Sequence, residues 1–196
     1  MKKIIDTSHQ ARISLIIGTA LEWLEFTLFA YFSTQISNLF FPKDSLFWAQ
    51  MKTYFIFATS YLVRPFGAIL FGYIGDRIGR KPALVYSISI MSIATCSIGL
   101  IPPYEKIGGL STLLLIALRV TQGICVAGEF NGSNVVLVEN YGKRTPFRAG
   151  LWTPLAASMG MTLGSLFASL FQSFPSSNYM WRIPFIFCGL GGFVGL

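Results

Sequence analysis

Charged residues are scarce in this chain of 196 residues, because Lys, Arg, Asp and Glu together make up only 12% of it. An ordinary soluble domain carries about 25%. The segments 83–104 and 149–181 contain none of these four residues, while 53% of the chain is hydrophobic. So few charges cannot cover a water-exposed surface, which excludes a soluble globular domain. Since about 20 apolar residues span the hydrocarbon core of a bilayer, the chain is predicted to be a polytopic membrane protein.

Histidine and cysteine are also rare. The only histidine, His9, lies in the polar N-terminal segment, and the three cysteines lie singly inside apolar runs, without the paired spacing of a zinc site or a disulfide framework. No nucleophile-plus-base pair or metal-ligand cluster is apparent, so we expect neither an enzyme nor a metal or other cofactor. The net charge of +7 comes from short clusters between apolar runs. Because these form no basic face, a nucleic-acid partner is not expected either.

The apolar runs predict an all-α bundle of six transmembrane helices joined by short connectors that leave no room for a soluble domain. The predicted helices cover 13–40, 50–74, 83–101, 111–138, 148–172 and 182–196. The last apolar stretch, 183–196, covers about 21 Å of a hydrocarbon layer about 30 Å thick. From this we expect the chain to be part of a longer polypeptide or a truncated product.

Positive charge is distributed unevenly over the connectors. Nine Lys or Arg residues lie at the N-terminus and in the even-numbered connectors, and four lie on the opposite side. The positive-inside rule therefore places both termini in the cytoplasm and the protein in the bacterial cytoplasmic membrane, with lipid as its surroundings.

Six polar residues lie inside predicted spans, where a charge near the centre costs about 2.5–3.5 kcal/mol and normally faces protein or a wet cavity. They are Glu22, Glu25, Arg64, Arg119, Gln122 and Glu129. By the helical rise, Glu22 and Glu25 lie about 14 and 18 Å into the first helix, and Arg119 lies about 12 Å into the antiparallel fourth helix. Acid and base are thus predicted at similar depth, with Gln122 and Glu129 on the Arg119 side of their helix.

Two interpretations of these charges stay open. One carboxylate can simply neutralise Arg119 in a structural salt bridge, or the group can form a proton-coupling and solute-binding site, since burial favours the neutral form of a carboxyl group. Five charges and Gln122 exceed what one neutralising pair requires, which favours the second interpretation. Arg64 precedes Pro65, which removes a helix hydrogen bond and frees a carbonyl, so a backbone-binding role is nearly as well supported as a functional one.

Glycines spaced one helical turn apart mark three predicted spans. They are Gly128 and Gly132, Gly160 and Gly164, and Gly191 and Gly195. Such pairs let helices approach closely, and we expect close packing here in preference to a moving seam.

The connector between the second and third predicted helices contains a specific motif. It reads Gly72-Tyr73-Ile74-Gly75-Asp76-Arg77-Ile78-Gly79-Arg80-Lys81. This segment closely resembles the signature loop of the major facilitator superfamily, G-x-x-x-D-R-x-G-R-K. Arg119-Val120-Thr121-Gln122-Gly123 is similar to the R-x-x-Q-G element of that family.

Further segments resemble the metabolite:proton symporters within that superfamily, a group that includes proline/betaine, citrate, 2-oxoglutarate and shikimate carriers. They are Glu22-Trp23-Leu24-Glu25-Phe26, Arg64-Pro65-Phe66-Gly67, Ala127-Gly128-Glu129 and Trp181-Arg182-Ile183-Pro184-Phe185. The chain departs from the group at Thr19, Glu25 and Ala127, where Asn, Asp and Gly are common.

The resemblance implies the N-terminal half of a twelve-helix carrier, built from two three-helix repeats, with the solute bound between halves. It implies symport of a small zwitterionic or anionic solute such as proline or betaine, driven by the proton gradient. Glu22, Glu25, Arg64, Arg119, Gln122 and Glu129 would couple proton and solute. Gly72, Asp76, Arg77, Gly79, Arg80, Lys81 and Glu139 would form the cytoplasmic gate.

The C-terminal half of such a carrier is missing from this sequence. Transport would then require a separately encoded second half or a homodimer. The alternative is a membrane subunit or remnant that transports nothing.

Overall fold

The computed structural model describes residues 2–141, 146–172 and 179–194, with side chains described for 16–79, 82–128, 150–172 and 179–192. Every regular element in this part of the chain is an α-helix. The prediction of an all-helical membrane bundle is confirmed. The helices are α1 (Lys2–Tyr31), α2 (Ser33–Phe40), α3 (Leu46–Leu62), α4 (Arg64–Ile78), α5 (Arg80–Leu100), α6 (Tyr104–Ile107), α7 (Gly109–Tyr141), α8 (Pro146–Gln172) and α9 (Arg182–Val194).

Two of the predicted helices are each divided in the structure. The segment predicted at 13–40 forms α1 and α2, which meet at Phe32, and the segment predicted at 50–74 forms α3 and α4, which meet at Val63. Pro65 explains the second division, because it has no N–H to donate to the preceding turn. The regular pattern resumes where the Gly67 N–H donates to the Val63 carbonyl at 3.1 Å.

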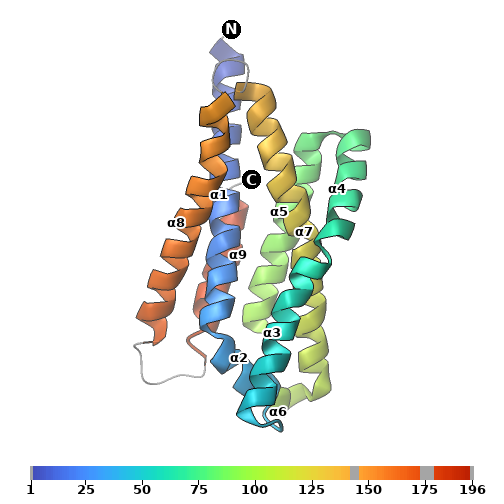
Figure 1. The fold of residues 1–196 in the computed structure, drawn as a ribbon, viewed down its shortest axis with the longest axis vertical. Helices are drawn as coiled ribbons and strands as arrows, with labels where there is room; N and C mark the ends of the chain where they lie inside the picture. Colours follow the sequence, from blue (N-terminus) through green and yellow to red (C-terminus); the bar gives the residue numbers. More distant parts are fainter. Residues whose placement is uncertain (1, 142–145, 173–178, 195–196) are drawn as a thin grey trace.

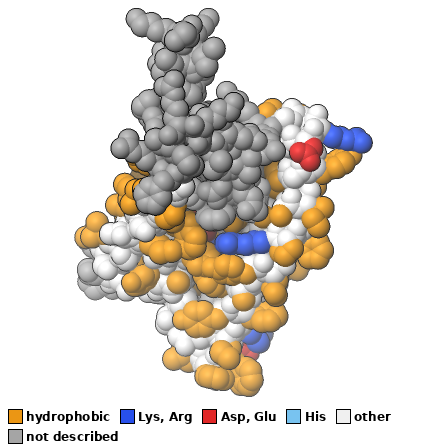
Figure 2. Space-filling model, turned by 45° about the horizontal axis from the view of Figure 1, so that its top comes forward, with side chains coloured by type: hydrophobic (Ala, Val, Ile, Leu, Met, Phe, Trp, Pro, Cys, Tyr) orange, Lys and Arg blue, Asp and Glu red, His pale blue; other side chains and the backbone are white. Residues whose placement is uncertain are grey.

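Four stretches of the described chain are long and apolar enough to cross a membrane. They are Leu46–Ile78, Pro82–Leu100, Gly109–Gly128 and Gly150–Gln172, and a shorter apolar helix covers Arg182–Gly192. The number of six crossings therefore stays a prediction. Hydrophobic side chains are spread over the described surface in Figure 2, as expected of helices that face lipid.

The long helices lie side by side along the long axis of the molecule (Figure 1). α1 packs chiefly against α8, and α5 packs against both α9 and α7, while α3 and α4 lie against α7. The N-terminus, the turn between α4 and α5, and the facing ends of α7 and α8 all lie at the upper end of the view. The start of α1, the α4–α5 turn and these ends of α7 and α8 therefore share one end of the bundle. Which side of the membrane that end faces stays a prediction.

Small residues allow α1 and α8 to approach closely. A methyl group added to Gly160 would collide with the main-chain carbonyl of Ala20, and one added to Gly164 would lie 2.9 Å from the Leu24 carbonyl oxygen. The Gly160 and Gly164 pair thus packs tightly, as expected. Gly128 contacts Phe71 and Gly191 contacts Leu21. The side chain position of Gly132 and the whole of Gly195 lie outside the described part.

The larger hydrophobic cluster fills the end of the bundle where α2 and α6 lie. It includes Phe29 of α1, Phe32 between α1 and α2, Ile36 of α2, Leu115 of α7 and Trp181 just before α9. This apolar packing fixes the last turns of α1 against α7. The polar residues of α1 and α7 lie immediately next to it along both helices.

Candidate functional site

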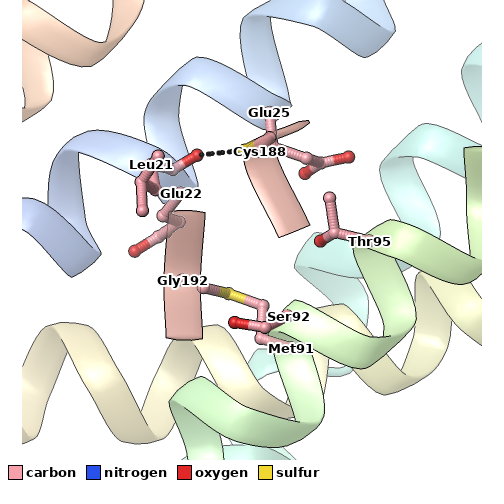
Figure 3. A pocket seen from close by; sticks show the side chains of 8 residues that line it. All are labelled: Leu21, Glu22, Glu25, Met91, Ser92, Thr95, Cys188 and Gly192. Carbon is pink, nitrogen blue, oxygen red and sulfur yellow. Dashed lines mark hydrogen bonds between the residues drawn. The ribbon is translucent and has the colours of Figure 1, made fainter. Parts of the chain in front are cut away.

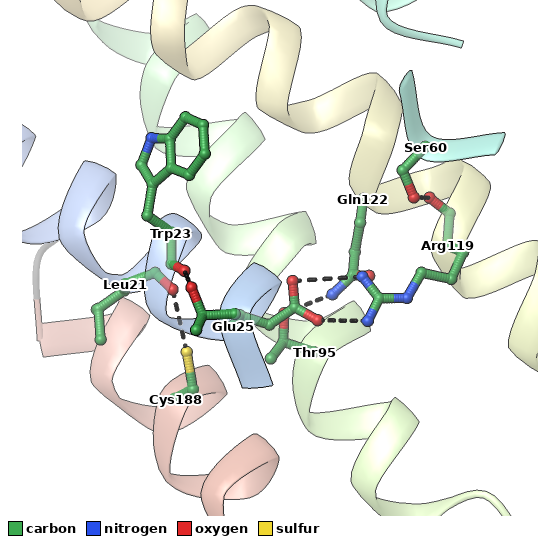
Figure 4. A network of polar contacts seen from close by, with 9 residues as sticks. Leu21, Trp23, Glu25, Ser60, Thr95, Arg119, Gln122 and Cys188 are labelled. Carbon is green, nitrogen blue, oxygen red and sulfur yellow. Dashed lines mark hydrogen bonds and ion pairs between the residues drawn. The ribbon is translucent and has the colours of Figure 1, made fainter. Parts of the chain in front are cut away.

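Glu25 of α1 and Arg119 of α7 form an ion pair inside the bundle. Arg119 Nη2 lies 2.8 Å from Glu25 Oε1, and Arg119 Nη1 donates to Glu25 Oε2 at 3.4 Å (Figure 4). Both residues are buried, and the Arg119 side chain is only 1% exposed. The pair is therefore held by the attraction of opposite charges and by one long hydrogen bond.

Neighbouring helices fix the position of Arg119. Its guanidinium lies over the Phe29 ring, 3.6 Å from the centroid, where cation and ring attract each other. The Ser60 hydroxyl of α3 donates to the Arg119 main-chain carbonyl at 3.1 Å. The cation is thus held by α1 and its helix by α3. Removing one partner of such a buried pair costs about 3–5 kcal/mol, because the other charge stays uncompensated.

A second polar contact lies less than one helical turn further along α7. Gln122 Nε2 donates to Thr95 Oγ1 of α5 at 2.8 Å, and both residues are buried. Gln122 Oε1 is also buried and makes no hydrogen bond with the described residues. The polar side chains of α7 therefore connect α1 on one side and α5 on the other.

Glu22 of α1 is paired with a different arginine. Arg64 Nη2 of α4 lies 3.9 Å from Glu22 Oε1, which is an ion pair but too long for a hydrogen bond. The Arg64 guanidinium also lies over the Tyr61 ring, 4.3 Å from the centroid. The two carboxylates of α1 thus pair with arginines of two different helices.

A small cavity touches both carboxylates. Its volume is about 10 Å³, which is room for about one water molecule. Figure 3 shows its lining: Leu21, Glu22, Glu25, Met91, Ser92, Thr95, Cys188 and Gly192. The Ser92 hydroxyl is buried there without a hydrogen-bond partner among the described residues, whereas the Cys188 thiol donates to the Leu21 carbonyl at 3.3 Å. Polar atoms of α1 and α5 therefore converge beside the ion pair.

The structure brings together five of the six predicted polar residues in or beside this site. The side chain of Glu129 lies outside the described part, although its main chain belongs to α7. Sequence reasoning did not find Ser92 and Thr95, which lie three apart on α5 and so share one face. Their only signal was a pair of small polar residues inside a chargeless span.

The predicted gate loop lies at the turn between α4 and α5. Gly79 has a φ of 109°, a conformation that favours glycine, and it ends α4 where Arg80 begins α5. Asp76 and Arg77 are exposed, and the Arg77 guanidinium lies 4.8 Å from the centroid of the Tyr73 ring. Gly72 has open space beside it. The side chains of Arg80, Lys81 and Glu139 lie outside the described part, so the gate stays a prediction.

The helical membrane bundle with acid–base pairs between its helices is the kind of fold that membrane carriers use. The family model of the Major Facilitator Superfamily matches residues 26–196. The chain belongs to this superfamily, and the resemblance recognised in the loop at 72–81 is confirmed.

Three bacterial relatives show what the chain is similar to. A citrate-proton symporter of Klebsiella pneumoniae is 35% identical, over 94% of this chain and 44% of the symporter. A glycine betaine/proline/ectoine/pipecolic acid transporter of Dickeya dadantii is 32% identical, over 98% of this chain and 40% of the transporter. An inner membrane metabolite transport protein of Escherichia coli is 32% identical, over 98% of this chain and 45% of that protein. The chain spans less than half the length of these curated relatives.

Proposed function

We propose that this chain forms one half of a proton-coupled symporter for a small zwitterionic or anionic metabolite, with proline or betaine as the first candidates. The observation that carries the proposal is the buried Glu25–Arg119 pair between α1 and α7. A carboxyl group beside a buried cation is either ionised and paired with it, or protonated, in which case the cation needs another counter-ion. Alternation between those states is what coupling to a proton gradient requires.

The relatives support the choice of solute and driving force. One is named as a proton symporter of citrate and another as a transporter of glycine betaine and proline. The chemistry shared by these solutes is a carboxylate on a small molecule. We therefore carry a carboxylate-bearing solute and proton symport over to this chain, with the proton gradient as the energy source and no cofactor.

The proposal also covers the part of the solute path that this chain does not form. Since the chain spans less than half of its relatives, we propose that the path closes against a second half or a second copy of this chain. The basic end of the bundle would face the cytoplasm of a bacterial inner membrane. There the loop at 72–81 and Glu139 would act as the gate, and Glu129 would join the coupling group.

Uptake of radiolabelled proline and glycine betaine tests this function. The chain would be expressed alone and with the second half of a homologous carrier, in bacteria that lack their own carriers for these solutes. Uptake above the empty-vector level that a proton uncoupler abolishes supports the proposal. Absence of uptake in both arrangements, with the protein present in the membrane, would favour a non-transporting accessory subunit.

Asp44→Asn is the matched control for Glu25→Gln in that assay. Asp44 also pairs with a cation, since Lys52 Nζ lies 2.7 Å from its Oδ2, but that pair is largely exposed. Exposed pairs contribute about 0–1 kcal/mol. Asp44→Asn should therefore keep uncoupler-sensitive uptake, whereas Glu25→Gln should lose it.

A further inference from the structure

Arg64 has far fewer partners than the other arginine of the site. Its one ionic contact in the described part is the 3.9 Å approach of Nη2 to Glu22. Its Nε is buried and makes no hydrogen bond with the described residues, which is also true of Arg119 Nε. Arg119, in contrast, presents two nitrogens to Glu25. A guanidinium offers five N–H donors, so most of the donor capacity of Arg64 is unused.

Arg64 is also accessible where Arg119 is not. The Arg64 side chain is 29% exposed, against 1% for Arg119. The Tyr61 ring supports one face of the Arg64 guanidinium at 4.3 Å. Stacking of this kind holds the plane of an arginine while leaving the N–H groups at its edge available. A charged group within a membrane span normally faces the protein interior or a water-filled cavity.

The other described arginines lack this combination. Arg182 donates from Nη1 to the main-chain carbonyls of Gly99 and Ile101 at 2.9 and 2.6 Å, which ties it to the end of α5. Arg77 lies one residue before the end of α4, where its guanidinium contacts the Tyr73 ring of the same helix. Among the described arginines, Arg64 is therefore the one that lies beside a carboxylate of α1 and still has N–H groups available for a ligand.

We propose that Arg64 binds the carboxylate group of the transported solute, and that the solute carboxylate displaces Glu22 as its counter-ion. The inference rests on the proposed function and adds to it the group that recognises the solute. A carboxylate fits the planar edge of a guanidinium with two parallel hydrogen bonds, which the 3.9 Å contact with Glu22 does not provide. The Glu25–Arg119 pair stays closed in this step. The class of solute is then a small molecule with a free carboxylate.

Protection of Arg64 from an arginine-specific reagent tests the site without any transport. The complete chain, reconstituted in lipid vesicles, would be treated with phenylglyoxal, and each modified arginine would be quantified by mass spectrometry. Arg64 should react and Arg119 should not. Glycine betaine should slow the modification of Arg64, whereas choline, which has the same trimethylammonium group and no carboxylate, should not. Arg77 serves as the exposed internal reference, whose rate should be the same with either compound.

The Glu22→Gln variant sharpens the test. Removing the competing counter-ion should lower the concentration of glycine betaine that gives half-protection by about two- to fivefold, the value of a weak ion pair. Asp44→Asn, which alters the Asp44–Lys52 pair outside the site, should leave that concentration unchanged. Equal protection by choline, no protection by either compound, or an unreactive Arg64 would overturn the proposal. Protection in a chain that shows no uptake would retain the site and contradict the transport function.

Discussion

Arg119 is enclosed by residues of several helices, with Glu25 and Phe29 of α1 around its guanidinium and Ser60 of α3 on its main chain. A charge in such surroundings is stable only while its partner is ionised. Protonation of the Glu25 carboxyl group would therefore change the contact between α1 and α7. The coupling chemistry of the site is therefore a property of this pair more than of any single residue.

A double-mutant cycle on this pair gives the first prediction. Glu25→Leu and Arg119→Leu should each destabilise the chain by about 3–5 kcal/mol, because each leaves a buried charge without a partner. The double variant should be destabilised by much less than the sum. Thermal unfolding in detergent would measure the three variants, and additive losses would show that the two residues do not interact.

The contact between Gln122 and Thr95 gives the second prediction. Thr95→Val removes the acceptor of the 2.8 Å hydrogen bond and should cost about 1–3 kcal/mol, because the Gln122 amide stays buried. Thr121→Val is the matched control, since the Thr121 hydroxyl donates only to the Ala117 carbonyl of its own helix. The control should unfold within a few degrees of the parent chain. Equal losses of stability in both variants would show that the contact between Thr95 and Gln122 adds nothing specific to the site.

Sequence reasoning found the charged residues of the site but not which residues pair. The helical rise places Glu22, Glu25 and Arg119 at similar depth, and depth alone leaves both carboxylates open as partners of Arg119. The choice depends on how α1 is rotated, which the packing of Phe29 over Arg119 fixes. Thr95 and Ser92 carry no charge, so nothing in the sequence separates them from ordinary packing residues.

At the scale of elements, the contact between α1 and α8 depends on the absence of side chains. Gly160→Ala should push α8 away from α1, because the new methyl group collides with the Ala20 carbonyl. We expect a loss of about 1–3 kcal/mol, as for other overpacked sites. Gly150→Ala lies on the same helix with nothing within 4 Å and should be neutral or slightly stabilising. Thermal unfolding of the two variants measures this difference. Equal stability of both variants would show that α1 and α8 do not pack tightly at Gly160.

Hydropathy predicted where apolar helices lie better than where they are interrupted. Hydropathy does not show that one helix ends at Leu62 and the next begins at Arg64, although Pro65 supplies the physical cause. No Pro or Gly explains the division at Phe32. Main-chain hydrogen bonds continue through it, from the Phe32 N–H to the Leu28 carbonyl and from the Ile36 N–H to the Phe32 carbonyl. Interruptions without Pro or Gly depend on tertiary packing, which a local pattern does not contain.

For the whole molecule, the Lys and Arg clusters of the sequence are predicted to lie at the end of the bundle that holds the α4–α5 turn, and this gives a prediction about orientation. A membrane-impermeant maleimide added to intact cells should modify Ser45→Cys, at the end without the basic clusters, and should spare Ile78→Cys, at the basic end. Both positions are exposed. After the cells are permeabilised, both variants should react. Modification of Ile78→Cys in intact cells would reverse the orientation.

Uphill accumulation tests most directly whether the Glu25–Arg119 pair couples solute to protons. Cells would be loaded with labelled glycine betaine under a proton gradient, and exchange without a gradient would be measured in the same cells. We expect Glu25→Gln to exchange solute across the membrane but to fail to accumulate it, whereas Asp44→Asn does both. Accumulation by Glu25→Gln to the level of the parent chain would contradict a coupling role for the buried pair.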